Sequence, residues 1–143
     1  MSDLAAFLAA RLDEDEAVAR RAASESPWSV SDTNDDGTRD VNPAEAPDGL
    51  WHGEVALHIA GNDATHIARH DPARVLREAE AGRALLAAYI KAEAALPRGQ
   101  RDDWEDSAVA CAHGKVDGLR AAVAIRAAVY SGHPGYDPAW APG

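Results

Sequence analysis

The hydrophobic positions near the N-terminus recur with the period of an α-helix. Within residues 3–23, large apolar side chains lie about one helical turn apart, and charged residues fill the positions between them. Ser2 precedes this run as a helix N-cap, and Asp3 suits the positive end of the helix dipole. The pattern therefore predicts one amphipathic helix over residues 3–23. Its apolar face is formed by Leu4, Phe7, Leu8, Leu12 and Val18.

Two more long helices are predicted in the second half of the chain. After a short helix over residues 63–70, Asp71 is placed as the N-cap of a helix that has Pro72 in its first turn and ends near residue 96. A third long helix is predicted over about residues 102–130. Its apolar stripe repeats every seven residues, at Val109, Val116, Val123 and Tyr130, with Leu119 between them. Gly114 and Gly118 either permit close helix packing there or loosen the middle of the helix.

The middle of the chain has the two-residue period of β-structure. Residues 27–31 read as a short extended segment, and residues 50–60 alternate between apolar and polar side chains. On the apolar face of the second segment we expect Trp51, Gly53, Val55, Leu57 and Ile59. The connection over residues 32–49 is rich in Asp, Asn, Gly and Pro, which are typical loop residues. We therefore expect a helix-dominated α+β fold, with three main helices and a two- or three-stranded antiparallel ribbon between the first and second.

The length and composition favour a single domain over residues 1–143. Alanine makes up a large part of the 46% hydrophobic fraction, so few large side chains remain to build the core. The loop at about residues 32–48 offers little apolar surface and is predicted to be mobile. The segment over residues 131–143 is rich in Pro and Gly, and its aromatic residues predict that it packs back onto the body.

The net charge of −10 is concentrated in one part of the chain. Residues 24–60 contain eight acids and only one base, Arg39, and so carry −7 of that total. A field of this sign repels the phosphates of nucleic acids and anionic lipids, and it attracts basic protein surfaces. Nucleic acid and membrane are therefore rejected as partners, and another protein with a basic surface is expected, or a second copy of the chain.

Cysteine content and hydropathy indicate a reducing cytoplasm. Cys111 is the only cysteine, so no disulfide can form within the chain. No apolar run approaches the roughly 20 residues that a membrane-spanning helix needs. The N-terminus lacks the basic region of a secretory signal.

His66 and His70 are the strongest metal-binding candidates. They are four residues apart, so on one helix they share a face and can ligate one ion. Zinc or another divalent metal would need further ligands, such as Asp71, Asp63, His113 or His133, and no spacing enforces them. The glutamate of a zinc-hydrolase motif is missing, because Ile67 follows His66. The alternative is a structural role at the joint before the helix that begins at Pro72.

A run over residues 32–40 resembles the start of a calcium-binding loop. Asp32, Asn34, Asp36 and Asp40 alternate along it, and Gly37 lies at the expected sharp turn. The bidentate glutamate that should occupy its twelfth position is Pro43 instead. A solvated Asp/Asn/Gly loop explains the same residues without a cation.

The sequence contains no recognisable set of catalytic residues. Cys111 and His113 are two residues apart, so on a helix their side chains point in different directions. Arg69, Arg74 and Arg77 could bind an anion near a helix start, although salt bridges to Glu78 and Glu80 are favoured. We therefore expect that the protein is not an enzyme.

Two stretches of the chain resemble a known family. They are residues 66–81, which read HIARHDPARVLREAEA, and His133-Pro134-Gly135-Tyr136 followed by Trp140. Together with residues 4–16, they resemble the domain-of-unknown-function family 6221, a group of small actinobacterial and phage proteins. The resemblance implies a cytoplasmic helical protein, and it carries over no activity. A strong preference for arginine over lysine fits a GC-rich genome of that kind.

The function expected from these observations is that of a small, acidic, non-enzymatic protein-interaction module. The alternative is a metal-binding protein or metal-dependent enzyme that uses His66 and His70, with Asp71 as a further ligand. A third class, a small-molecule-binding protein with a pocket between ribbon and helices, is neither favoured nor excluded. The candidate binding residues are His66, His70, Arg74, His133, Tyr136 and Trp140.

Overall fold

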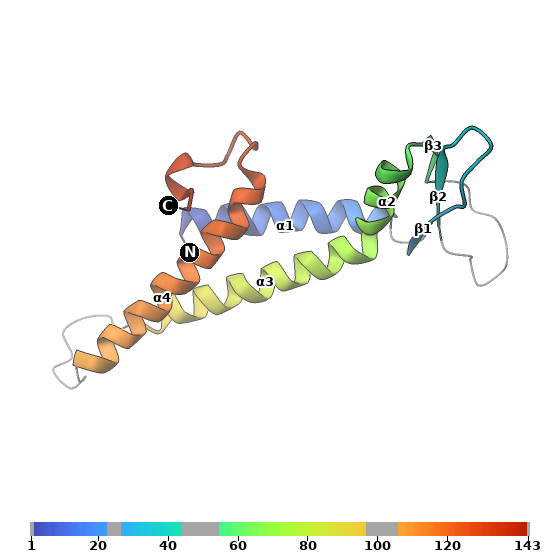
Figure 1. Ribbon diagram of the computed structural model, residues 1–143. Helices are drawn as coiled ribbons and strands as arrows, with labels where there is room; N and C mark the ends of the chain where they lie inside the picture. The colour runs from blue at the N-terminus through green and yellow to red at the C-terminus, as the bar shows by residue number, and fades with distance from the viewer. Residues whose placement is uncertain (1, 23–26, 44–54, 97–105, 143) are drawn as a thin grey trace. The chain divides into compact units, whose positions relative to one another are not determined.

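The computed structural model describes residues 2–22, 27–43, 55–96 and 106–142 (Figure 1). Within these ranges the chain is a helix-dominated α+β protein with four α-helices and one three-stranded antiparallel sheet, which confirms the expected fold class. The elements are α1 (Asp3–Ala22), β1 (Trp28–Val30), β2 (Arg39–Pro43), β3 (Ala56–Ile59), α2 (Gly61–Arg69), α3 (Pro72–Ala94), α4 (Asp106–Ala127), η2 (Ala128–Tyr130) and η3 (Pro138–Trp140). None of the described helices is long and apolar enough to span a membrane.

The described residues group into two compact units. One comprises residues 1–13 and 80–143, and the other comprises residues 14–79. The first, which we call the helical unit, contains α4 and the C-terminal segment, and the second, the sheet unit, contains the three strands and α2. Helices α1 and α3 each contribute residues to both. The two units are therefore described separately.

The buried side chains of the helical unit come from three helices. Leu8, Leu12 and Val123 are fully buried, and Tyr89 on α3 is 2% exposed. The heptad stripe predicted on α4 is confirmed, because Val116 and Val123 are buried while Val109 and Tyr130 are half-buried. Helix α1 begins where it was predicted to begin, since the Ala5 N–H donates to the Ser2 Oγ at 3.4 Å. Two of the remaining buried residues, Ala5 and Ala127, are alanines, so few large side chains build this core, as the composition predicted.

A glycine on α3 permits a close approach between α1 and α3 in this unit. A Cβ atom added to Gly82 would lie 2.8 Å from the Cδ2 and 3.1 Å from the Cδ1 of Leu12, so α1 and α3 are close at this point. A Cβ atom added to Gly114 or Gly118 would meet nothing within 4 Å. Close packing around those two glycines, one of the two alternatives for α4, is therefore not made by the described chain.

Alanine substitution at Gly118 and Gly82 is expected to change stability in opposite directions. Gly118→Ala should stabilise the protein by about 1 kcal/mol, because alanine favours an exposed helix interior over glycine. Gly82→Ala should destabilise it by about 1–3 kcal/mol, because the new methyl group overpacks the fully buried Leu12. Denaturant unfolding of both variants measures the two signs. Stabilisation by Gly82→Ala would show that Leu12 moves aside easily.

The sheet unit contains a β-hairpin, formed by β1 and β2, that was not predicted from the sequence. Strand β1 confirms the extended segment over residues 27–31, and it pairs with β2 with Val30 opposite Val41. Residues 39–43, expected to belong to a long connection, instead form β2. The reason is that Val41 is fully buried and Asp36-Gly37 supplies a tight turn, in which Gly37 has a φ of +83°. Mobility of the acidic loop remains a prediction.

The alternation predicted for residues 50–60 is wrong within strand β3. Residues 50–54 of that segment lie outside the described residues, and β3 itself spans Ala56–Ile59. Leu57, predicted to face the core, is 48% exposed. The cause is a register shift opposite Arg39 and Val41, together with a left-handed backbone at His58, where φ is +53°. A bulge of this kind turns side chains away from the two-residue period.

Helix α2 packs against the sheet and leads directly into α3. It contacts all three strands, which supplies the helical support that a small ribbon requires. The boundary between the helices is the predicted one, because Asp71 is buried and its Oδ1 accepts a hydrogen bond from the Arg74 N–H at 2.7 Å. Pro72 follows as the first helical residue.

Candidate functional site

The C-terminal segment of the helical unit is held by an aromatic cluster around Phe7. The Phe7 ring centroid lies 5.2 Å from that of Trp140 and 5.9 Å from that of Tyr136. Tyr130 and His133 approach the same ring at 6.5 and 5.7 Å. The prediction that residues 131–143 pack back onto the body is therefore confirmed for the described part, up to residue 142.

Polar contacts fix the same segment. The side chain of Arg11 contacts the His133 ring, and its guanidinium also lies 5.5 Å from the Phe7 centroid. The Gly135 N–H donates to His133 Nδ1 at 2.9 Å. Asp137 caps the short helix η3 by accepting a hydrogen bond from the Ala139 N–H. These contacts place Trp140 in one position relative to α1.

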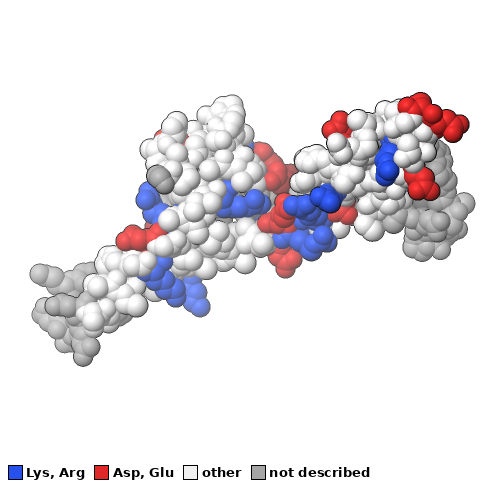
Figure 2. Space-filling view, in the orientation of Figure 1, with Lys and Arg blue, Asp and Glu red and all other residues white. Residues whose placement is uncertain are grey.

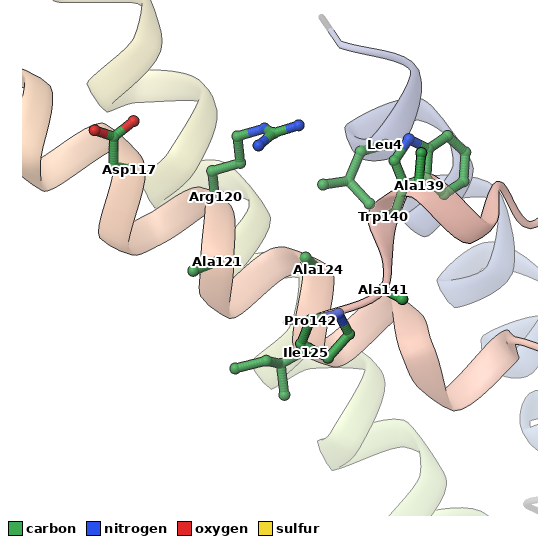
Figure 3. Close-up of a pocket in the computed structure, with 10 residues that line it drawn as sticks. All are labelled: Leu4, Asp117, Arg120, Ala121, Ala124, Ile125, Ala139, Trp140, Ala141 and Pro142. Carbon is green, nitrogen blue, oxygen red and sulfur yellow. The ribbon is translucent and has the colours of Figure 1, made fainter.

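A groove of about 470 Å³ lies between α4 and this C-terminal segment (Figure 3). One wall is formed by α4, and the other by the residues around Trp140 together with Leu4 of α1. The groove has two charged lining side chains, Asp117 and Arg120, and the others are apolar. The complete lining is Leu4, Asp117, Arg120, Ala121, Ala124, Ile125, Ala139, Trp140, Ala141 and Pro142.

The outward side of α4 continues the apolar surface of the groove. Ile125, which lines the groove, is 60% exposed, and Val129, four residues further on in η2, is 67% exposed. We call the surface formed by these two residues the outward side of α4. Both lie off the heptad stripe that faces the core. In the described part of the chain, the other two exposed large hydrophobic residues are Val18 and Leu57, at 59% and 48%, and both belong to the sheet unit. The prediction that Val18 lies on the buried apolar face of the first helix is therefore wrong. Exposed apolar residues that are contiguous with a groove are typical of binding surfaces, whereas isolated ones are common everywhere.

His66 and His70, the candidate metal ligands, lie at the end of α2. Their ring centroids are 4.3 Å apart, and His70 Nδ1 donates to the His66 carbonyl oxygen at 2.9 Å. Both residues are exposed. Asp71, the proposed further ligand, instead accepts the capping hydrogen bond from Arg74. Among the described residues, no group of three or more His, Cys, Asp or Glu side chains is placed to hold a metal ion.

The candidate binding residues fall into two separate sets. His66, His70 and Arg74 belong to the sheet unit, while His133, Tyr136 and Trp140 belong to the helical unit. Arg74 forms the predicted ion pair with Glu78, with Nε and Oε1 2.7 Å apart. Of the six, Trp140 alone lines the groove, and His70 lines a smaller apolar pocket beside Trp28.

The residues of the calcium-like run are hydrogen-bonded to one another. Asp36 Oδ1 accepts from the Thr38 hydroxyl at 2.5 Å and from the Thr38 N–H at 2.9 Å. Asp40 Oδ1 accepts from the Asn34 amide and from the His58 N–H. The Thr38 hydroxyl and N–H lower the pKa of the Asp36 carboxyl, and His58 adds to this shift. These contacts fit the solvated-loop interpretation, since the chain's own donors bind carboxylate oxygens of Asp36 and Asp40.

Sequence reasoning missed the residues of α4 that line the groove. Asp117, Arg120 and Ile125 were not predicted as site residues, because they belong to no sequence motif. The signal for Ile125 and Val129 was present, since two branched aliphatic residues lie off the predicted heptad stripe. Arg120 carries no such signal, because an arginine on an exposed helix face is ordinary.

The fold and groove define a small, helix-dominated α+β protein whose described surface presents an apolar groove and no assembled metal site. The chain belongs to the family of unknown function DUF6221, whose model matches residues 1–142. This match confirms the resemblance drawn from residues 66–81 and from the C-terminal HPGY motif. No curated protein and no solved structure matches the chain.

Proposed function

We propose that this protein is a non-enzymatic interaction module that binds another protein through the outward side of α4 and the adjoining groove. The observation that carries the proposal is the exposure of Ile125 and Val129 beside the groove. Burying both side chains against a partner would be favourable by about 1.5–3 kcal/mol for each residue that becomes fully covered. An apolar centre of this kind, flanked by charged groups, is typical of protein-binding surfaces.

The acidic hairpin of the sheet unit supports a partner with a basic surface. Asp32, Asp35 and Asp36 are exposed around the β1–β2 turn, and Figure 2 shows acidic side chains at this end of the sheet unit. A negative field speeds the encounter with a positively charged protein and disfavours nucleic acid or anionic membrane. The hairpin therefore guides association, while the groove supplies the contact.

The proposed setting is a reducing cytoplasm. Cys111 is exposed on α4 and is not in a disulfide. Free exposed thiols persist in compartments where glutathione and thioredoxin keep them reduced. The actinobacterial or phage origin implied by the sequence resemblance is consistent with this setting.

Metal binding is the second candidate function, and the ring contact between His66 and His70 favours it. Two imidazoles 4.3 Å apart could ligate one ion if a third ligand came from elsewhere. Against this, the nitrogen His70 Nδ1 is engaged with the His66 carbonyl oxygen. The geometry is explained by a structural role, in which His70 terminates α2.

The two interpretations of the histidine pair predict different responses to a chelator. We expect each substitution in the His66→Gln/His70→Gln variant to lower the free energy of unfolding by about 1 kcal/mol or less. The melting temperature of the wild type and of the variant should be the same with and without chelator. A bound ion would instead raise the melting temperature of the wild type by mass action. The measurement is thermal unfolding of both proteins after elemental analysis. A chelator-sensitive transition found in the wild type alone would make metal binding the primary function.

The interaction proposal is tested by copurification from native lysate with matched charge insertions. Ile125→Glu should abolish capture of the partner, because it places a carboxylate at the centre of the proposed contact. Leu57→Glu is the control, since it introduces the same charge at an exposed leucine of the sheet unit. Equal loss with both variants, or with neither, would refute the proposed surface.

A further inference from the structure

We propose that the groove recognises a peptide segment in which a carboxylate lies close to a large apolar side chain. This inference rests on the proposed function, and it specifies what the partner presents at the contact. The observation that carries it is the juxtaposition of Arg120 with Trp140 and Leu4 across the groove (Figure 3).

Arg120 is a cation whose charge is unmatched within the described residues. Arg20, Arg74 and Arg83 form ion pairs with Glu16, Glu78 and Asp13. Arg120 makes no hydrogen bond or ion pair with any described residue, although it lines the same groove as Asp117. In Figure 3 its side chain extends from α4 toward Leu4 and Trp140. A guanidinium so placed matches a carboxylate, which it can bind through two parallel hydrogen bonds.

The apolar part of the groove provides the site for the large side chain. Ala121 and Ala124 leave space on the α4 wall, and the Trp140 indole forms part of the opposite wall. Trp140 is held in place by Phe7 and by Tyr136, whose ring centroid lies 5.7 Å away. A wall that is already ordered loses little conformational entropy on binding, which favours affinity. The volume of about 470 Å³ accommodates one aromatic or branched aliphatic side chain and its neighbours.

Asp117 gives the groove a direction. It lies beyond Arg120 at the end away from Trp140, so the lining changes from apolar through cationic to anionic (Figure 3). A segment that carries apolar, acidic and then basic or neutral residues matches this order. A polyanion does not match it, because Asp117 would repel phosphates at the far end. The occupant is therefore a protein segment with a single carboxylate at the Arg120 position.

The test uses an array of synthetic 12-residue peptides and the full chain. Each peptide carries one Leu, Phe or Trp anchor, with Glu, Gln or Lys placed one to four residues away. We expect the best Glu peptides to bind at least about tenfold more tightly than their Gln counterparts, which is the effect of one charge-assisted pair. Fluorescence anisotropy measures affinity, and the NMR signal of the Trp140 indole, assigned with Trp140→Phe, reports occupancy of the groove.

Two exposed cations of α4 provide matched variants. Arg120→Gln should reduce the preference for Glu over Gln peptides to less than about twofold, and Arg120→Lys should restore part of it. Lys115→Gln removes the same charge from an exposed position that does not line the groove, and the preference should persist. Binding without a Glu preference, a preference that survives Arg120→Gln, or no binding by any peptide would each overturn the inference.

The failure of this inference is distinguishable from failure of the proposed function. If Ile125→Glu abolishes partner capture while Arg120→Gln leaves it unchanged, the surface is correct and the carboxylate recognition is wrong. If neither variant affects capture, the proposed surface itself is wrong. Sedimentation that shows a dimer of the wild type, lost in Ile125→Glu, would assign the groove to a second copy and overturn the inference.

Discussion

Leu8→Ala is expected to lower the free energy of unfolding by about 3 kcal/mol. Leu8 lies on the buried side of α1 and is 0% exposed, so truncation removes its buried methyl groups and leaves a cavity. The loss is large for a domain of this size, whose total stability is on the order of 5–15 kcal/mol. The other buried residues of the helical unit include Ala5 and Ala127, whose short side chains cannot fill the space.

Urea denaturation of wild type and Leu8→Ala measures this effect. The control is Leu57→Ala, which deletes the same atoms from a leucine that is 48% exposed and should cost about 1 kcal/mol or less. Equal losses in the two variants would show that α1 does not build the core of the helical unit.

Phe7→Ala is expected to lower the free energy of unfolding by about 2–3 kcal/mol and to release the C-terminal segment. Phe7 is half-buried, and its ring contacts four aromatic rings of residues 130–140 as well as the guanidinium of Arg11. Without that ring, the segment retains the Arg11–His133 contact and the cap of η3 but loses its apolar anchor. Trp140 would then no longer form a fixed wall of the groove.

The release is measured by near-ultraviolet circular dichroism and by the Trp140 fluorescence of a variant that retains this tryptophan alone. Val129→Ala is the control, because Val129 is 67% exposed and lies outside the aromatic cluster. An unchanged near-ultraviolet spectrum in Phe7→Ala would mean that the other contacts hold the segment by themselves.

The helices could be predicted from the sequence because local features define them. The period of the apolar positions located α1 and α4, and Asp71-Pro72 located the start of α3. Capping depends on neighbouring residues alone, so it is readable without knowledge of the tertiary structure. The aromatic composition of the C-terminal segment likewise predicted its packing, although not that Phe7 would be at the centre of the cluster.

The hairpin was assigned incompletely because two local patterns compete there. The density of Asp, Asn and Gly over residues 32–38 favoured a loop. The predicted loop was too long, because it also included residues 39–43, which form β2. The Asp36-Gly37 pair is itself a hairpin-turn signal that should have limited the loop. The exposure of Leu57 could not be read from the sequence, because it depends on the bulge opposite Arg39 and Val41.

The groove could not be predicted because it depends on contacts between segments far apart in the chain. Leu4, Arg120 and Trp140 come together only when the C-terminal segment folds back onto α1 and α4. The histidine pair shows the converse case, in which sequence spacing was informative but insufficient. The four-residue spacing brought the His66 and His70 rings together, whereas a third ligand would have to come from elsewhere in the fold.

The central claim is that a protein partner covers the outward side of α4 and the groove. Hydrogen exchange of the captured complex, compared with the free protein, tests it most directly. If a partner covers this surface, exchange should slow in the C-terminal half of α4 and over residues 138–142, with a smaller change in the β1–β2 hairpin. Slower exchange confined to the hairpin or to the end of α2 around His66 and His70, with α4 unchanged, would contradict it.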